Sequence, residues 1–286
     1  MHINIFDSNV CLLGEGPLWH PERQQLFWFD ILGKKLYTCE NNQAKFWQFD
    51  EYVSAAGWVD KETLLIASET ALFRFDLRTG NSVPLAELEA DNPITRSNDG
   101  RADPWGGFWI GTMGKNAEAN AGAIYRWFQG KLEKLYSDIT VSNSICFSPD
   151  RVFAYFCDTR ERKIMRQALD EGGYPTGPTT VFVDLLSEGL KPDGAVIDAQ
   201  GCLWNAQWGA SRVARYSPNG DFLSSIYFPT GQVSCPAFGG KYMATLFVTT
   251  AAVGKDADPN AGQTFATETI FQGQKEHQVI IPQKLR

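Results

Sequence analysis

Histidine is scarce in this chain: His2, His20 and His277 are the three among 286 residues. Hydrolysis by a general-base histidine needs that side chain, with an orienting carboxylate, inside the catalytic pocket. His20 is the one conceivable candidate, but its place beside Pro21 in an expected turn favours a packing role. The sequence also has no G-x-S-x-G, P-loop or H-E-x-x-H motif, so it argues against serine hydrolases, P-loop enzymes and zinc proteases.

Long apolar stretches and clustered basic residues are missing as well. No segment approaches the ~18 consecutive apolar residues of a membrane-spanning helix, and the N-terminus lacks the pattern of a secretory signal. The six cysteines are scattered without a C-x-x-C pair, and we interpret them as reduced and mostly buried. A net charge of -7 without a basic face argues against nucleic acid. We expect a cytoplasmic protein, a monomer or small homo-oligomer, that binds neither membranes nor nucleic acid.

Short runs of β-branched and aromatic residues, separated by Gly, Pro, Asn and Asp, dominate the chain and indicate an all-β protein. Six segments share one form: an apolar run, a turn of the type Asp/Pro-x-x-Gly, and a second apolar run. They begin at Pro17, Gly57, Gly100, Ile145, Ala195 and Cys235. Their separation of about 40–50 residues is the length of a four-stranded propeller blade. A β-sandwich or two barrels would not explain a sixfold recurrence. The sequence therefore predicts one domain, residues 1–286, folded as a six-bladed β-propeller and closed by strands at 3–6 and 279–281.

Polar residues recur just before the first apolar run of several repeats. In a propeller these positions meet at one end of the central channel, and here they hold Glu15, Arg96, Asn98, Asn143 and Asp193. Buried ionisable groups are costly unless they are paired or bind a metal. Glu15, Asn143 and Asp193 offer oxygen donors that suit Ca²⁺, Mg²⁺ or Mn²⁺, and Zn²⁺ is also compatible. The alternative is that these residues only cap turns, but their matching register favours one divalent cation site.

Four groups of motifs, taken in order, resemble a known family. They are Leu13–Trp19; Arg96–Arg101 with Trp109–Met113; Ser142–Ile145 with Phe147–Asp150; and Pro192–Gly194 with Asp198–Trp204. Together they are similar to the senescence-marker-protein, gluconolactonase and luciferin-regenerating-enzyme family, which includes regucalcin and bacterial sugar lactonases. The resemblance runs from about Leu13 to beyond Trp208 and loosely to the end of the chain.

The resemblance implies roles for individual residues. Glu15, Asn143 and Asp193 correspond to the family's divalent-metal ligands, and Arg96 and Asn98 to its substrate contacts. The family often has a further acidic residue that contacts the substrate. Its nearest match in this chain is Glu118, and Asn116 is the competing position. Ser144 stands where many members have glycine, a departure that affects backbone freedom rather than ligand chemistry.

The leading functional hypothesis is hydrolysis of a sugar lactone to the sugar acid. A divalent cation would polarise the ester carbonyl, while Arg96 and Asn98 would orient the substrate. The attacking water would be activated either by Asp193 as general base or by the cation itself. Three alternatives stay open: a calcium-binding regulatory propeller without catalysis, a protein-interaction scaffold, and an esterase or phosphotriesterase of the calcium-propeller type.

Overall fold

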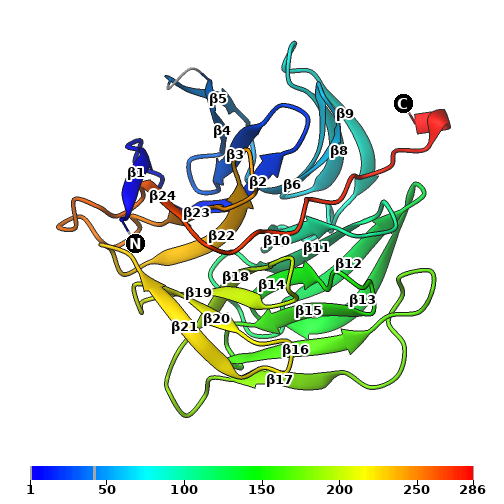
Figure 1. The fold of residues 1–286 in the computed structure, drawn as a ribbon. Helices are drawn as coiled ribbons and strands as arrows, with labels where there is room; N and C mark the ends of the chain where they lie inside the picture. Colours follow the sequence, from blue (N-terminus) through cyan, green and yellow to red (C-terminus); the bar gives the residue numbers. More distant parts are fainter. Residues whose placement is uncertain (1, 41–42, 286) are drawn as a thin grey trace.

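The computed structural model describes residues 2–40 and 43–285. Within them the chain forms 24 strands, arranged in six four-stranded antiparallel sheets around a ring (Figure 1). The six-bladed β-propeller predicted from the repeats is confirmed. The ends of the predicted domain, residues 1 and 286, lie outside the described residues. None of the helices described is long and apolar enough to cross a membrane.

Each blade is a meander of consecutive strands from the channel outwards, except the last. Blade one is β2 (Gly14–His20), β3 (Gln25–Asp30), β4 (Lys35–Glu40) and β5 (Gln43–Gln48). Blade two is β6 (Val53–Asp60), β7 (Thr63–Ser68), β8 (Ala71–Asp76) and β9 (Ser82–Glu87). Blade three is β10 (Thr95–Ala102), β11 (Phe108–Gly114), β12 (Gly122–Phe128) and β13 (Lys131–Ile139).

The second half of the ring repeats this arrangement. Blade four is β14 (Ser142–Phe147), β15 (Phe153–Asp158), β16 (Lys163–Ala168) and β17 (Thr180–Asp184). Blade five is β18 (Pro192–Ile197), β19 (Leu203–Gln207), β20 (Arg212–Tyr216) and β21 (Phe222–Tyr227). Blade six is β22 (Val233–Gly239), β23 (Thr245–Thr250), β24 (Thr264–Glu268) and β1 (Asn4–Asp7).

The predicted ring closure was half right. β1 does join the last blade, but it pairs with β24, with Asn4 opposite Ala266. The expectation that 279–281 supplies the closing strand was wrong, because this segment belongs to a tail that crosses the far end of the ring (Figure 1). There the amide of Val279 donates to the carbonyl of Trp58 and that of Ile280 to Gly106, while the apolar side chains of Val279 and Ile281 pack among blades two and three. The tail ends in a short 3₁₀ helix, η1 (Gln283–Leu285).

Aspartates at the hairpin turns explain why the Asp-x-x-Gly pattern recurs. Asp198 Oδ1 accepts the amides of Gln200 and Cys202, both at 2.9 Å, and its Oδ2 accepts from Arg215 on the third strand. In blade three, Asp103 caps its turn in the same way and pairs with Arg126, with 2.7 Å between Oδ2 and Nε. Each buried carboxylate thus satisfies turn amides and a guanidinium together, which fixes both hairpins against the third strand.

The blades pack through apolar side chains that face between neighbouring sheets. Trp28, Trp109, Trp127 and Trp204 are among the largest fully buried side chains. Cys11, Cys146, Cys157, Cys202 and Cys235 are buried thiols, which agrees with their interpretation as reduced small apolar groups. The result is a rigid ring whose innermost strands, β2, β6, β10, β14, β18 and β22, surround the channel.

Candidate active site

Every innermost strand has a break in register close to its first residues. The irregularities fall at Glu15/Leu18, Val53/Ala55, Ser97/Gly100, Asn143/Cys146, Pro192/Ala195 and Val233/Cys235. A β-bulge re-aims the side chains beside it. At two of these breaks the backbone is left-handed, with φ of 53° at Gly16 and 60° at Ser144. The repeated bulge is therefore the local device that presents the polar residues at one end of the channel.

The sequence-predicted residues do come together there. Glu15, Arg96, Asn98, Asn143 and Asp193 are all at most 6% exposed. Arg96 Nη1 donates to Asn98 Oδ1 at 2.8 Å, and Asn98 Nδ2 donates to Asn143 Oδ1 at 3.0 Å, across the boundary between blades three and four. The amide of Gly16 donates to Glu15 Oε2 at 3.0 Å, which holds the carboxylate against the bulge of β2.

Acidic side chains gather at this end of the channel. Burial raises the pKa of Glu15 to about 8, and the neighbouring charge of Asp99 adds to the effect. Burial also raises the pKa of Asp193 well above its usual range, with further contributions from Glu15 and Asp99. Burial raises the pKa of Asp99 to about 6, opposed by the charge of Arg101, and lowers that of Arg96 to about 10. The three buried acids thus hold their protons more tightly than free carboxyl groups, and a cation bound among them would favour their charged forms.

The donor chemistry agrees with a hard divalent cation. Within the described part of the chain, no three His, Cys, Asp or Glu side chains lie together as a ready metal-binding group. A cation at this end of the channel therefore depends on the amide oxygen of Asn143 beside the carboxylates of Glu15 and Asp193. Two carboxylates and an amide carbonyl, with room left for water or substrate oxygens, are ligands that Ca²⁺, Mg²⁺ and Mn²⁺ accept. The side chains of Glu15, Asn143 and Asp193 therefore have the donor chemistry that a divalent cation requires.

Glu118 and Asn116, the two candidates for a further substrate contact, lie in the loop between β11 and β12. The carboxylate of Glu118 accepts from both the backbone amide and the side-chain amide of Asn116, each at 3.0 Å. The two candidates therefore form one capped turn, and their contact with substrate stays a prediction.

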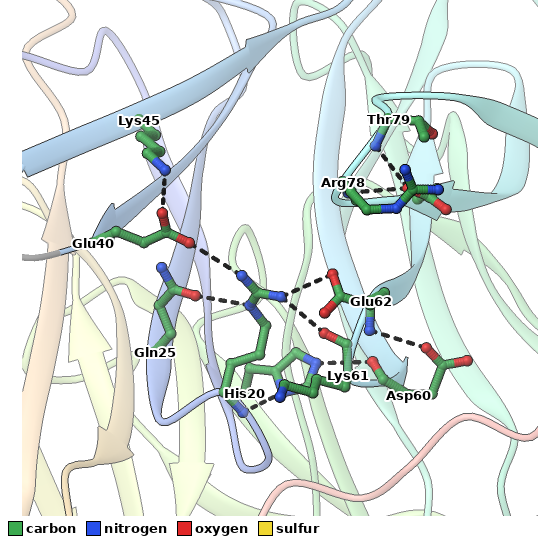
Figure 2. Close-up of polar contacts among 11 residues, drawn as sticks. His20, Gln25, Glu40, Lys45, Asp60, Lys61, Glu62, Arg78 and Thr79 are labelled. Carbon is green, nitrogen blue, oxygen red and sulfur yellow. Dashed lines mark hydrogen bonds and ion pairs between the residues drawn. The ribbon is translucent and has the colours of Figure 1, made fainter.

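An open hollow of about 530 Å³ lies at the opposite end of blades one and two. Arg23 occupies it and donates to Glu40, Glu62, Gln25 and the carbonyl of Lys61 (Figure 2). His20 lies beside this network and contacts the carbonyl of Asp60, so its predicted packing role agrees with the structure. Four of the five N–H groups of the guanidinium are used in these bonds, which join blade one to blade two.

Two further residues of the site were not among the sequence candidates. Asp99 follows Asn98 directly, and its Oδ2 accepts the amide of Ile145 at 2.7 Å; a carboxylate within the Arg96–Arg101 motif was the available signal. Thr159 lies beyond the end of β15 and accepts from Asn143 Nδ2 at 2.9 Å. No motif marks Thr159, because its importance comes from its contact with Asn143 in β14, 16 residues earlier in the chain.

Comparison with known proteins places the chain among a defined set of relatives. The family model described as "SMP-30/Gluconolactonase/LRE-like region" matches residues 13–252. A "Putative sugar lactone lactonase" of Rhizobium meliloti is 41% identical over 272 residues, covering 92% of each chain. An "L-arabinolactonase" of Azospirillum brasilense is 37% identical over 273 residues, covering 91% of this chain and 90% of the relative. A solved structure, described as the calcium-binding protein regucalcin of Agrobacterium tumefaciens, superposes with a TM-score of 0.94 at 40% identity and covers 96% of both chains.

Proposed function

The chain belongs to the SMP-30/gluconolactonase/LRE-like family, and we propose that it is a lactonase that hydrolyses the ring ester of a sugar lactone to the free sugar acid. The observation that carries the proposal is the buried group of Glu15, Asn143 and Asp193 at one end of the channel, with Arg96 and Asn98 beside it. The names of the sugar lactone lactonase and the L-arabinolactonase among its relatives support the substrate class.

Glu15, Asn143 and Asp193 would hold one divalent cation. When bound, the cation supplies Lewis acidity to the ester carbonyl and stabilises the negative charge that develops on its oxygen. Calcium is the first candidate, because the regucalcin of Agrobacterium tumefaciens is described as a calcium-binding protein. Zinc, magnesium and manganese are the others that the oxygen-donor set permits.

The chain's own side chains divide the remaining work. Asp193 accepts a proton from the attacking water as the water oxygen bonds to the carbonyl carbon. The ring C–O bond then breaks, and the ring oxygen leaves as a hydroxyl after taking up that proton from Asp193. Arg96 donates hydrogen bonds that orient hydroxyl groups or a carboxylate of the substrate. Asn98 gives both of its amide hydrogens to Ser142 and Asn143, so it contacts the substrate through Oδ1, which accepts from a substrate hydroxyl. The hydrogen bond from Arg96 to Asn98, at 2.8 Å, holds the two side chains in a fixed relation before substrate arrives.

Ring opening releases a proton at neutral pH, so it can be followed with a pH indicator. A panel of aldono- and aldarolactones is incubated with the protein as purified, with EDTA, and after addition of single divalent metals. Acceleration that EDTA removes and one metal restores would support the whole proposal. Acceleration that survives EDTA would support the lactonase and contradict the cation. No acceleration over spontaneous opening with any metal would contradict the lactonase and favour a cation-binding propeller without catalysis.

A further inference from the structure

Asn143 can present either its oxygen or its nitrogen to the channel, because a primary amide is nearly symmetric in shape. Only the oxygen can bind a cation, since the amide nitrogen carries two hydrogens and has no lone pair to donate. Something must therefore select one of the two orientations. The hydrogen bonds around Asn143 show what does.

On the channel side the selection comes from Asn98. Its Oδ1 accepts from Arg96, and its Nδ2 donates to the carbonyl of Ser142 at 2.8 Å, so the orientation of Asn98 is itself fixed. Asn98 Nδ2 then meets Asn143 at 3.0 Å as a donor. A flipped Asn143 would place two N–H groups against each other.

On the other side the selection comes from Thr159. Its hydroxyl donates to the carbonyl of Pro192 at 2.7 Å, which commits the hydroxyl hydrogen and leaves the oxygen as an acceptor. Asn143 Nδ2 donates to that oxygen at 2.9 Å. A flipped Asn143 would here place two acceptors together. Arg96, Asn98, Asn143, Thr159 and the carbonyl of Pro192 thus form one directed chain of hydrogen bonds across blades three, four and five.

Thr159 is held in place independently of any ligand. Its amide donates to the carbonyl of Val141 at 3.0 Å. The preceding carboxylate, Asp158, accepts the amides of Thr140 at 2.7 Å and Val141 at 3.0 Å. The hydroxyl of Thr159 also contacts the carbonyl of the residue immediately before Asp193, so one side chain is tied to Asn143 and to the backbone that carries Asp193.

We propose that Thr159 is a positioning residue of the cation site, which orients the amide oxygen of Asn143 into the channel. The inference rests on the proposed cation. Outer residues that orient metal ligands contribute about 10–100-fold to metal affinity. Thr159 is such an outer residue: it contacts the ligand Asn143 and does not contact the cation itself.

The test measures binding of Ca²⁺ and Mn²⁺ to the chelator-treated protein by isothermal titration calorimetry, beside the activity. Thr159→Val keeps the shape of the side chain and removes the hydroxyl; we expect it to weaken cation binding by about 10–100-fold, whereas Thr159→Ser stays within roughly threefold of wild type. Thr38→Val is the matched control, because Thr38 Oγ1 makes a similar buried bond, 2.8 Å to the carbonyl of Leu26, in blade one. It should leave cation affinity unchanged.

A double-mutant cycle distinguishes orientation of the Asn143 amide from a merely structural role of Thr159. In an Asn143→Ala background, Thr159→Val should cause no further loss of affinity, because there is no amide left to orient. Unchanged affinity in Thr159→Val, or an equal loss with and without Asn143, would overturn the inference while leaving the proposed function intact. A wild-type protein that binds none of Ca²⁺, Mn²⁺, Mg²⁺ and Zn²⁺ would overturn the cation site and this inference together.

Discussion

Arg101 and Glu276 form an ion pair at the end of the channel opposite to Arg96, with 2.5 Å between Nη1 and Oε1. Their side chains are only 10% and 5% exposed. Arg101 also donates to the carbonyls of Ile145 and Ala195, and so links the innermost strands of three blades. Trp58 Nε1 donates to the carbonyl of Glu276 at 3.0 Å, which fixes the tail to blade two. The C-terminal tail therefore closes the far end of the channel through one buried charge pair.

We expect Glu276→Ala to lower the free energy of unfolding by about 3–5 kcal/mol, because it leaves the Arg101 guanidinium buried without its counter-charge. Urea unfolding of chelator-treated protein measures the effect. Lys275→Ala, at the exposed neighbouring position, is the control and should change stability by no more than about 0.5 kcal/mol. If Glu276→Ala behaves like Lys275→Ala, the pair does not hold the tail in place.

Asp193→Asn tests the assigned base. The change keeps the size of the side chain and removes both its charge and its basicity, so we expect kcat for lactone opening to fall by about 10²–10⁴-fold, the contribution of a general base. Circular dichroism should show an unchanged fold. Asp256→Asn, in the exposed loop before β24, serves as the control and should retain wild-type rates. Activity of Asp193→Asn near that of the control would remove Asp193 from the mechanism.

The recurring hairpins predict the propeller and the end of the channel at which the polar residues meet, because both follow from one local pattern. Glu15, Arg96, Asn98, Asn143 and Asp193 could be chosen from the sequence since each lies in the short stretch before the first apolar run of its repeat. Their chemical roles remain predictions, because position alone does not show what a side chain binds.

The repeats in the sequence do not predict the path of the C-terminal tail or the role of Thr159 beside the site. Arg101 and Glu276 are 175 residues apart, and Glu276 has no equivalent in any blade. The segment 279–281 has the apolar composition of a strand, but its partners are Trp58 in β6 and Gly106 in the loop after β10, which only the assembled ring brings together. Thr159 likewise acquires its importance from two neighbouring blades.

Acid should destabilise the protein through His20, which is fully buried. The amide of Arg23 donates to Nδ1, so Nε2 carries the hydrogen that it donates to the carbonyl of Asp60 at 3.0 Å. The ring is thus neutral, and burial lowers the pKa of His20 below its ordinary value of 6.5. The unfolded chain then binds more protons than the folded one below that pH, so the stabilisation is complete above pH 6.5 and is lost as the pH falls.

The measurement compares the melting temperature of wild type and His20→Gln at pH 8 and pH 5.5. The loss attributable to His20 is bounded by about 1.4 kcal/mol per pH unit. Other titrating groups are common to both proteins and cancel in the comparison. We expect the wild type to lose more stability than the variant between the two pH values. Equal losses would show that protonation of His20 in the folded protein does not lower its stability.

Ser144 combines backbone strain with a useful hydroxyl, and two substitutions separate them. Its φ of 60° is left-handed, while its Oγ donates to the carbonyl of Asp193 and accepts from Asn205 Nδ2. Ser144→Ala keeps the strain and loses both bonds, so we expect it to lower the free energy of unfolding by about 1–3 kcal/mol. Ser144→Gly loses the same bonds but relieves the strain, and it should be more stable than Ser144→Ala by about 1 kcal/mol. At Ser82, which is exposed in β9 and pairs in register with Phe75 of β8, the order should reverse, since glycine weakens an extended strand. If the alanine variant were more stable than the glycine variant at both positions, the bulge of β14 would tolerate a side chain without strain. Serine would then contribute at position 144 through its hydrogen bonds alone.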